Sequence, residues 1–185
     1  MNLTVRKMAI TGMLGAVSIV LGVTRLGFIP VPTAAGTATI MHVPVILAAV
    51  AEGPIVGGLV GLIFGIFSLM QPSSPMFADP LVAVLPRIII GITAAYAFLG
   101  LRRFKMGTGL VAAAVVGTLT NTCLVLGMAV LRGYLPRGVA LTVGVIHGLP
   151  EIIVAAAVTL PVGLALVRAG YVRRQGYAPR PGDAA

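Results

Sequence analysis

The sequence predicts an all-α membrane protein with six transmembrane helices and both termini in the cytoplasm. Three observations carry this prediction: the composition, the length of the apolar runs and the placement of the basic residues. Of the 185 residues, 58% are hydrophobic and only 9% are charged, and the mean hydropathy is +1.09. A soluble domain carries about 25% charged residues. Most of the surface of this protein must therefore face lipid rather than water.

The apolar runs divide the chain into six spans, each near the roughly 20 residues that cross about 30 Å of hydrocarbon. The spans are expected at about 5–26, 38–51, 54–70, 81–99, 107–131 and 139–167. The second is shorter and ends at Gly53, and Pro54 suits the first position of the third. Pro150 and Pro161 predict kinks in the sixth.

Basic residues set the expected orientation. With the N-terminus inside, nine Lys and Arg side chains lie in cytoplasmic segments and three in outer segments. This bias follows the positive-inside rule and explains the net charge of +9 without a nucleic-acid partner. Arg6 and Lys7 precede an apolar run longer than a signal peptide needs, so we expect an uncleaved first helix. Residues 1–168 then form one six-helix domain, followed by a disordered basic cytoplasmic tail, 169–185.

A few polar or ionisable side chains lie at membrane depth, where they are costly and indicate function by default. Their places along the spans put them in the outer or middle part of the membrane, beneath Pro-rich outer loops at 27–37 and 71–80. They are His42, Arg87, Asn121, His147 and Glu151.

Two interpretations of these residues stay open. Arg87 and Glu151 form a structural ion pair between helices, or Arg87 presents its planar guanidinium to a ligand carboxylate. In the second case Glu151 or His147 binds a hydroxyl or an amide. The two interpretations are compatible if Glu151 holds Arg87 in place. His147 and Asn121 are equally well explained as groups satisfied within the bundle. His42 is better explained by a position in the interfacial zone.

Small residues recur at four-residue spacing in two spans. The third carries Gly53, Gly57, Gly61 and Gly65, and the first carries Gly12 and Ala16, with Gly15 beside them. This pattern allows close helix approach. Internal packing is favoured for the third span. The first span is the better candidate for docking another membrane subunit.

Patterns typical of catalysis are missing. The sequence has no HExxH, no GxSxG and no Walker-type glycine loop. His147 and Glu151 have no third ligand nearby, so we expect neither a metal nor another cofactor. The chain is therefore not expected to be an enzyme, and energy for active uptake has to come from partners.

Several motifs resemble the substrate-binding S components of energy-coupling factor (ECF) vitamin transporters. The resemblance covers nearly the whole chain and is strongest across 39–65. The motifs are TIMHVPVILAAVAEGP at 39–54, GGLVGLIFG at 57–65, Phe77-Ala78-Asp79-Pro80-Leu81, Leu85-Pro86-Arg87-Ile88 and His147-Gly148-Leu149-Pro150-Glu151.

The resemblance implies a multi-pass receptor in the plasma membrane of a prokaryote. Such proteins bind a vitamin or precursor in an outward-facing pocket that the loops after the first and third helices cover. A transmembrane coupling subunit and two cytoplasmic ATPases complete the complex, which is thought to release ligand inside as the S component topples. The substrate-binding positions implied here are His42, Gln71, Phe77, Arg87, Asn121, His147 and Glu151.

Docking on the coupling subunit usually uses Ala-x-x-x-Ala in the first helix of these proteins. Here the implied docking residues are Gly12, Gly15 and Ala16, and Gly12-x-x-x-Ala16 departs from the usual motif.

The region 39–65 looks closest to the pantothenate and folate branches, whose ligands carry carboxylates that suit Arg87. The chain has no Trp, six Phe and four Tyr, and a pterin favours more aromatic stacking than this. Pantothenate is therefore the favoured candidate for the ligand, and folate is the second candidate. The alternative function is a standalone secondary carrier or channel for a small solute. A membrane enzyme and a purely structural subunit are weaker alternatives.

Overall fold

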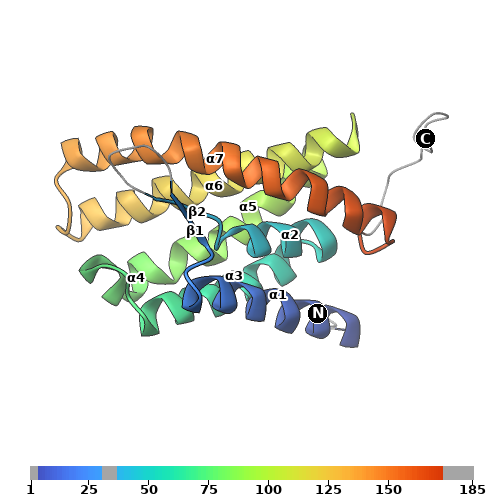
Figure 1. Cartoon of the computed structure of the whole chain (residues 1–185), viewed down its shortest axis with the longest axis horizontal. Helices are drawn as coiled ribbons and strands as arrows, with labels where there is room; N and C mark the ends of the chain where they lie inside the picture. The colour runs from blue at the N-terminus through green and yellow to red at the C-terminus, as the bar shows by residue number, and fades with distance from the viewer. Residues whose placement is uncertain (1–3, 31–36, 173–185) are drawn as a thin grey trace.

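The computed structural model describes residues 4–30 and 37–172 and shows a bundle of helices that run roughly along one direction (Figure 1). This confirms the predicted all-α fold. The helices are α1 (Val5–Val23), α2 (Val43–Glu52), α3 (Pro54–Met70), α4 (Pro80–Ala83), α5 (Leu85–Leu101), α6 (Met106–Leu131) and α7 (Arg137–Arg168). Two short strands, β1 (Phe28–Pro30) and β2 (Thr37–Thr39), and a 3-10 helix, η1 (Pro75–Ala78), complete the described elements.

Within the described residues, four units are long and apolar enough to cross a membrane: α1, α4 with α5, α6 and α7. The second span is different. Helix α2 has only 10 residues, or about 15 Å at 1.5 Å per residue, which is half of the hydrocarbon thickness. The expected helical start near residue 38 is wrong: residues 37–39 form β2, and α2 begins only at Val43. A short apolar run fits a strand as well as a helix, so periodicity alone did not separate the two.

The strands β1 and β2 pair antiparallel, with Phe28 opposite Thr39 and Pro30 opposite Thr37. The sequence predicted an irregular loop here. Three-residue strands are too short to show a period of two, and Pro30 lacks the N–H group that a ladder needs. The residues between the strands, 31–36, lie outside the described part of the chain.

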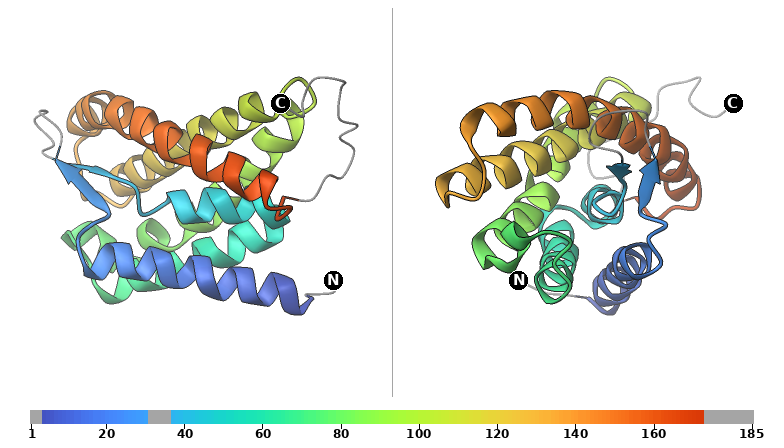
Figure 2. Two further views of the ribbon diagram at one scale, coloured as in Figure 1. Left: turned by 45° about the vertical axis from the view of Figure 1, so that its right-hand side comes forward. Right: turned by 60° about the vertical axis from the view of Figure 1, so that its left-hand side comes forward.

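Helix α1 begins and α7 finishes at the same end of the bundle, as Figure 1 and the left view of Figure 2 show. At this end Arg6 Nε lies 2.7 Å from Glu52 Oε1, and Arg6 Nη2 donates to the Tyr171 carbonyl at 2.8 Å. This arrangement agrees with an even number of crossings. Helix α7 continues through Pro150 and Pro161, and the kinks there stay a prediction. Most of the expected tail, 173–185, lies outside the described residues.

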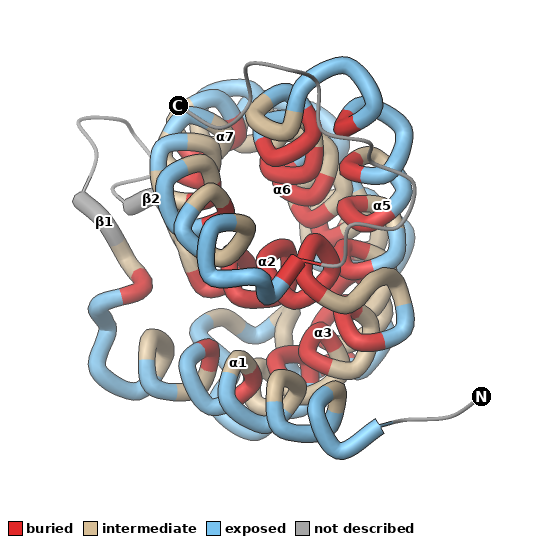
Figure 3. The backbone as a smooth tube through the Cα atoms, turned by 90° about the vertical axis from the view of Figure 1, so that its right-hand side faces the viewer, coloured by how far each residue is buried: buried red, intermediate tan, exposed pale blue. Residues whose placement is uncertain are grey.

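Helix α2 is the most buried element of the bundle. Every residue from Val43 to Ala51 is buried, and the tube view shows α2 enclosed by the neighbouring helices (Figure 3). By contrast α1 buries only Gly15 and Ser18. Its many exposed apolar side chains suit contact with lipid or with a membrane partner.

Glycines let α3 and α5 approach closely. A Cβ added at Gly57 would lie 3.0 Å from Gly91 Cα, and one at Gly61 would lie 2.1 Å from the Arg87 carbonyl oxygen. Gly65 faces Val84 in the same way. The internal-packing interpretation of this stripe is therefore confirmed. Gly53 has another role, because its φ of 95° ends α2.

The fourth span is interrupted, whereas the sequence predicted a continuous helix. Helix α4 ends at Ala83, and α5 starts at Leu85 with Pro86 in its first turn. Pro86 has no N–H to donate to the Val82 carbonyl four residues earlier. That carbonyl is consequently available to a side chain.

Candidate substrate-binding site

A cavity of about 1010 Å³ lies in the outer half of the bundle, beyond the N-terminal end of α2. Its volume is at the upper end of the range of about 300–1,000 Å³ for small-molecule sites. The short α2 explains the cavity, because no helix among the described residues fills the outer half of this span. All the predicted substrate-binding side chains line it: His42, Gln71, Phe77, Arg87, Asn121, His147 and Glu151.

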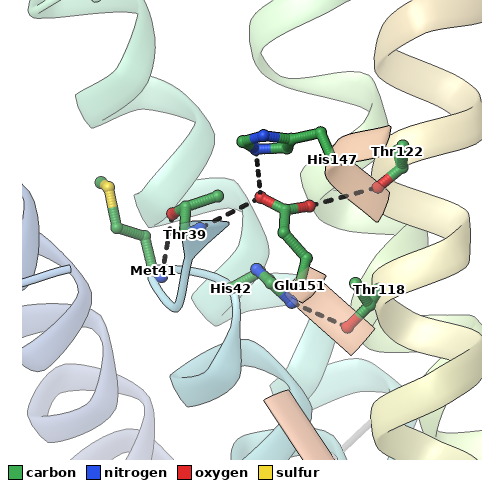
Figure 4. A network of polar contacts seen from close by, with 7 residues as sticks. All are labelled: Thr39, Met41, His42, Thr118, Thr122, His147 and Glu151. Carbon is green, nitrogen blue, oxygen red and sulfur yellow. Dashed lines mark hydrogen bonds and ion pairs between the residues drawn. The ribbon is translucent and has the colours of Figure 1, made fainter. Parts of the chain in front are cut away.

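His42 forms part of the cavity floor as the residue that precedes α2. Its side chain is buried, and its Nε2 lies 2.8 Å from Thr118 Oγ1 (Figure 4). The Nδ1 atom has no hydrogen-bond partner within the described residues. The expected interfacial position is wrong, because the His42 side chain is buried inside the bundle and is only 1% exposed. The N-terminus of α2 also carries partial positive charge, which favours an anionic ligand above it.

Arg87 projects from the first turn of α5 and is 5% exposed. Its Cζ lies 5.4 Å from the ring centre of Phe64 and 4.9 Å from that of Phe77, in cation–π range. Nη1 donates to the Val82 carbonyl at 3.0 Å, and Nε has no partner in the described part of the chain. A guanidinium has five N–H donors, so this desolvated cation retains donors for a ligand.

Glu151 on α7 is held by three donors that come from three elements (Figure 4). Its Oε1 accepts from the Thr39 backbone N–H at 3.1 Å and lies 3.0 Å from His147 Nε2. Its Oε2 accepts from Thr122 Oγ1 at 3.3 Å. Among the residues that the structure describes, Arg87 and Glu151 form no direct ion pair. The ion-pair interpretation is therefore wrong, because nearer donors already satisfy Glu151.

Asn121 and His147 add further polar atoms to the cavity. Asn121 lies on α6, between the helices that carry Arg87 and Glu151. Its Oδ1 and the Nδ1 of His147 are both buried without a hydrogen bond to a described residue. Buried polar atoms without partners are rare in proteins. This favours ligand contact over a purely structural bridge between helices.

Comparison with known proteins identifies the family. The profile of the ECF transporter substrate-specific component matches residues 6–163. This chain belongs to that family. It is a multi-pass membrane protein of a bacterial ECF transporter family and a transporter subunit, not an enzyme. The resemblance seen in the sequence is confirmed.

Two related proteins are similar to this S component. The pantothenic acid transporter PanT of Lactococcus lactis subsp. cremoris (strain MG1363) is 30% identical over 156 residues, which cover 71% of this chain and 78% of the relative. A solved structure described as the S component of a bacterial ECF transporter has a TM-score of 0.58 at 22% identity. It covers 88% of this chain and 94% of its own, and at this identity it supports the fold alone.

One ion pair of this S component lies at the outer end of the bundle and was missed by the sequence interpretation. Arg132 Nε lies 2.6 Å from Asp79 Oδ2, and Asp79 Oδ1 accepts from the Leu81 N–H at 2.9 Å. The hydrogen bond from Arg132, and next that from Leu81, hold the pKa of the Asp79 carboxyl below its ordinary value. The carboxylate is therefore ionised at neutral pH. The Asp-Pro start of a helix was the available signal.

The proposed docking residues of α1 lie on different faces. Gly12 and Ala16 are exposed, and a Cβ added at Gly12 would meet nothing within 4 Å. Gly15 is buried, and a Cβ there would lie 2.9 Å from Ile63 Cδ1 on α3. Gly15 thus serves internal packing, which leaves Gly12 and Ala16 on the free surface.

Proposed function

We propose that this S component captures pantothenate on the outer side of the membrane and delivers it inward with a coupling subunit and two ATPases. The observation that carries the proposal is the distribution of charge around the cavity. A cationic group, Arg87, lies on α5, and an anionic group, Glu151, lies on α7. Helix α6 packs against both and places Asn121 between them.

This order of groups matches the order of groups along pantothenate. The ligand has a carboxylate at one end, an amide in the middle and two hydroxyls at the other end. The carboxylate would accept charge-assisted hydrogen bonds from Arg87, which are the strong ones. The amide would meet Asn121, and the hydroxyls would donate to Glu151 or to His147. The pantothenate transport named for the 30% identical relative supports the same choice.

Folate is the competing ligand. Its carboxylates also suit Arg87, and a cavity of about 1010 Å³ has room for it. Two of the Phe rings that line the cavity already stack on Arg87. Stacking surface for a pterin is reduced accordingly, which favours the smaller ligand.

The proposal predicts that pantothenate stabilises the purified protein against heat. A ligand at 100 times its Kd raises the free energy of unfolding by about 2.7 kcal/mol if it binds only the folded state. Thermal unfolding in detergent with pantothenate, folate or neither measures this directly. Vesicles that contain this chain alone should hold pantothenate without accumulating it. A stabilising effect of folate only, or accumulation by the chain alone, would contradict the proposal.

Docking on the coupling subunit is proposed for the exposed pair Gly12 and Ala16 of α1. Small residues four apart allow a partner helix to approach closely. Gly12→Leu should therefore reduce copurification with the coupling subunit several-fold while ligand binding stays normal. Gly127→Leu on α6 is the matched control, because a Cβ there also meets nothing within 4 Å. Equal copurification of both variants would rule out this surface.

A further inference from the structure

The ion pair between Asp79 and Arg132 does not line the cavity, and yet it is unusually well formed. Arg132 follows α6, and Asp79 lies between η1 and α4, more than 50 residues earlier in the chain. The Asp79 side chain is only 5% exposed, whereas that of Arg132 is 52% exposed. Exposed ion pairs contribute little, but this carboxylate is buried and has a second donor. The pair therefore fixes the start of α4 to the outer end of α6.

A short path of contacts leads from this pair to Arg87. Asp79 accepts from the Leu81 N–H and so begins α4. One residue further, the Val82 carbonyl accepts from Arg87 Nη1 at 3.0 Å. This carbonyl is available because Pro86 cannot donate to it. Two residues before Asp79, the ring of Phe77 lies 4.9 Å from Arg87 Cζ. The segment around Asp79 thus contacts the guanidinium at two points.

We propose that Asp79 and Arg132 are positioning residues that set the orientation of the Arg87 guanidinium and thereby the preference for a carboxylate ligand. The inference rests on the proposed function, since it assigns the ligand carboxylate to Arg87. A guanidinium binds a carboxylate through two parallel hydrogen bonds, and this geometry depends on the plane of the group. If α4 loses its anchor, the Val82 carbonyl and the Phe77 ring shift, and the plane is no longer fixed.

The test compares binding of pantothenate with that of pantothenol, in which a hydroxymethyl group replaces the carboxylate. The Kd of pantothenol divided by the Kd of pantothenate measures the carboxylate preference. Asp79→Asn keeps an acceptor for the start of α4 but removes the charge, and Arg132→Gln removes the other partner. Each should lower the ratio roughly tenfold, within the range for residues of one network, and leave the Kd of pantothenol nearly unchanged.

Three further variants distinguish positioning from a general effect. The double variant that combines Asp79→Asn with Arg132→Gln should lose no more carboxylate preference than either single variant, because both substitutions break the same ion pair. Arg132→Lys, which keeps a cation, should retain most of the preference. Arg137→Gln removes an exposed charge at the same outer end and should behave as the unmodified protein. An unchanged ratio in Asp79→Asn and Arg132→Gln, or additive losses in the double variant, would overturn the inference.

A measurement without ligand separates this inference from the proposed function. Hydrogen–deuterium exchange of residues 81–88 should be faster in Asp79→Asn and Arg132→Gln than in the unmodified protein and in Arg137→Gln. Equal exchange in all four proteins would overturn the inference whatever the ligand is. If the unmodified protein shows no preference for pantothenate over pantothenol, the proposed function is wrong. Faster exchange would then still support the link from the ion pair to Arg87.

Discussion

Replacing Arg87 by glutamine is expected to weaken pantothenate binding by at least about 100-fold, or about 2.7 kcal/mol. The ligand carboxylate would lose its charge-assisted hydrogen bonds in a site where water replaces them poorly. Arg87→Lys should give an intermediate loss, since an ammonium keeps the charge but not the planar pair of donors. Isothermal titration of the purified protein with pantothenate measures both Kd values.

Two controls accompany the Arg87 variants. Arg137→Gln removes one positive charge from the exposed outer end of the bundle and should bind normally. The free energy of unfolding without ligand should not fall strongly in Arg87→Gln, because this change removes a buried charge rather than breaking an ion pair. Normal pantothenate binding by Arg87→Gln would refute the carboxylate assignment.

Replacing Gly61 by alanine should destabilise the bundle more than any other single methyl addition on α3. The new Cβ would lie 2.1 Å from the Arg87 carbonyl oxygen, which is backbone and has little freedom to move. Overpacking of this kind costs about 1–3 kcal/mol and occasionally more. The midpoint of thermal unfolding in detergent should fall by roughly 5–10 °C.

Gly58→Ala is the matched control for Gly61→Ala on the same helix. A Cβ at Gly58 would lie 3.8 Å from its nearest neighbour, an ordinary contact with Ile88. Its midpoint should stay close to that of the unmodified protein. Because Gly61 packs against the backbone of Arg87, its alanine variant should also bind pantothenate more weakly. Equal unfolding midpoints for Gly61→Ala and Gly58→Ala would mean that α3 and α5 separate easily, which would contradict close packing at Gly61.

The sequence predicted the number and the order of the crossings because lipid imposes a simple length requirement on apolar runs. It also identified the residues around the cavity. Arg87, Asn121 and Glu151 are polar exceptions inside apolar spans, and such exceptions are kept away from lipid. All three line the same cavity, because the helices that carry them run side by side.

Other features depend on contacts that a single sequence does not show. The sequence indicated a short second span, but the run before His42 fits a helix or a strand equally well. The start of α2 at Val43 and the hairpin were therefore not predicted. Of the two interpretations of Glu151, the ion pair with Arg87 is wrong, although opposite charges at similar depth suggest such a pair. The actual donors include a backbone N–H of β2, which carries no sequence signature. The contact between Asp79 and Arg132 joins residues from separate loops.

Mass spectrometry of the small molecules that copurify with the protein shows whether the outer cavity binds one small carboxylate-bearing vitamin through Arg87. Protein purified from cells grown with pantothenate should release pantothenate upon denaturation, and Arg87→Gln protein prepared in parallel should release almost none. Release of a ligand without a carboxylate, or equal release of pantothenate from both proteins, would contradict the account.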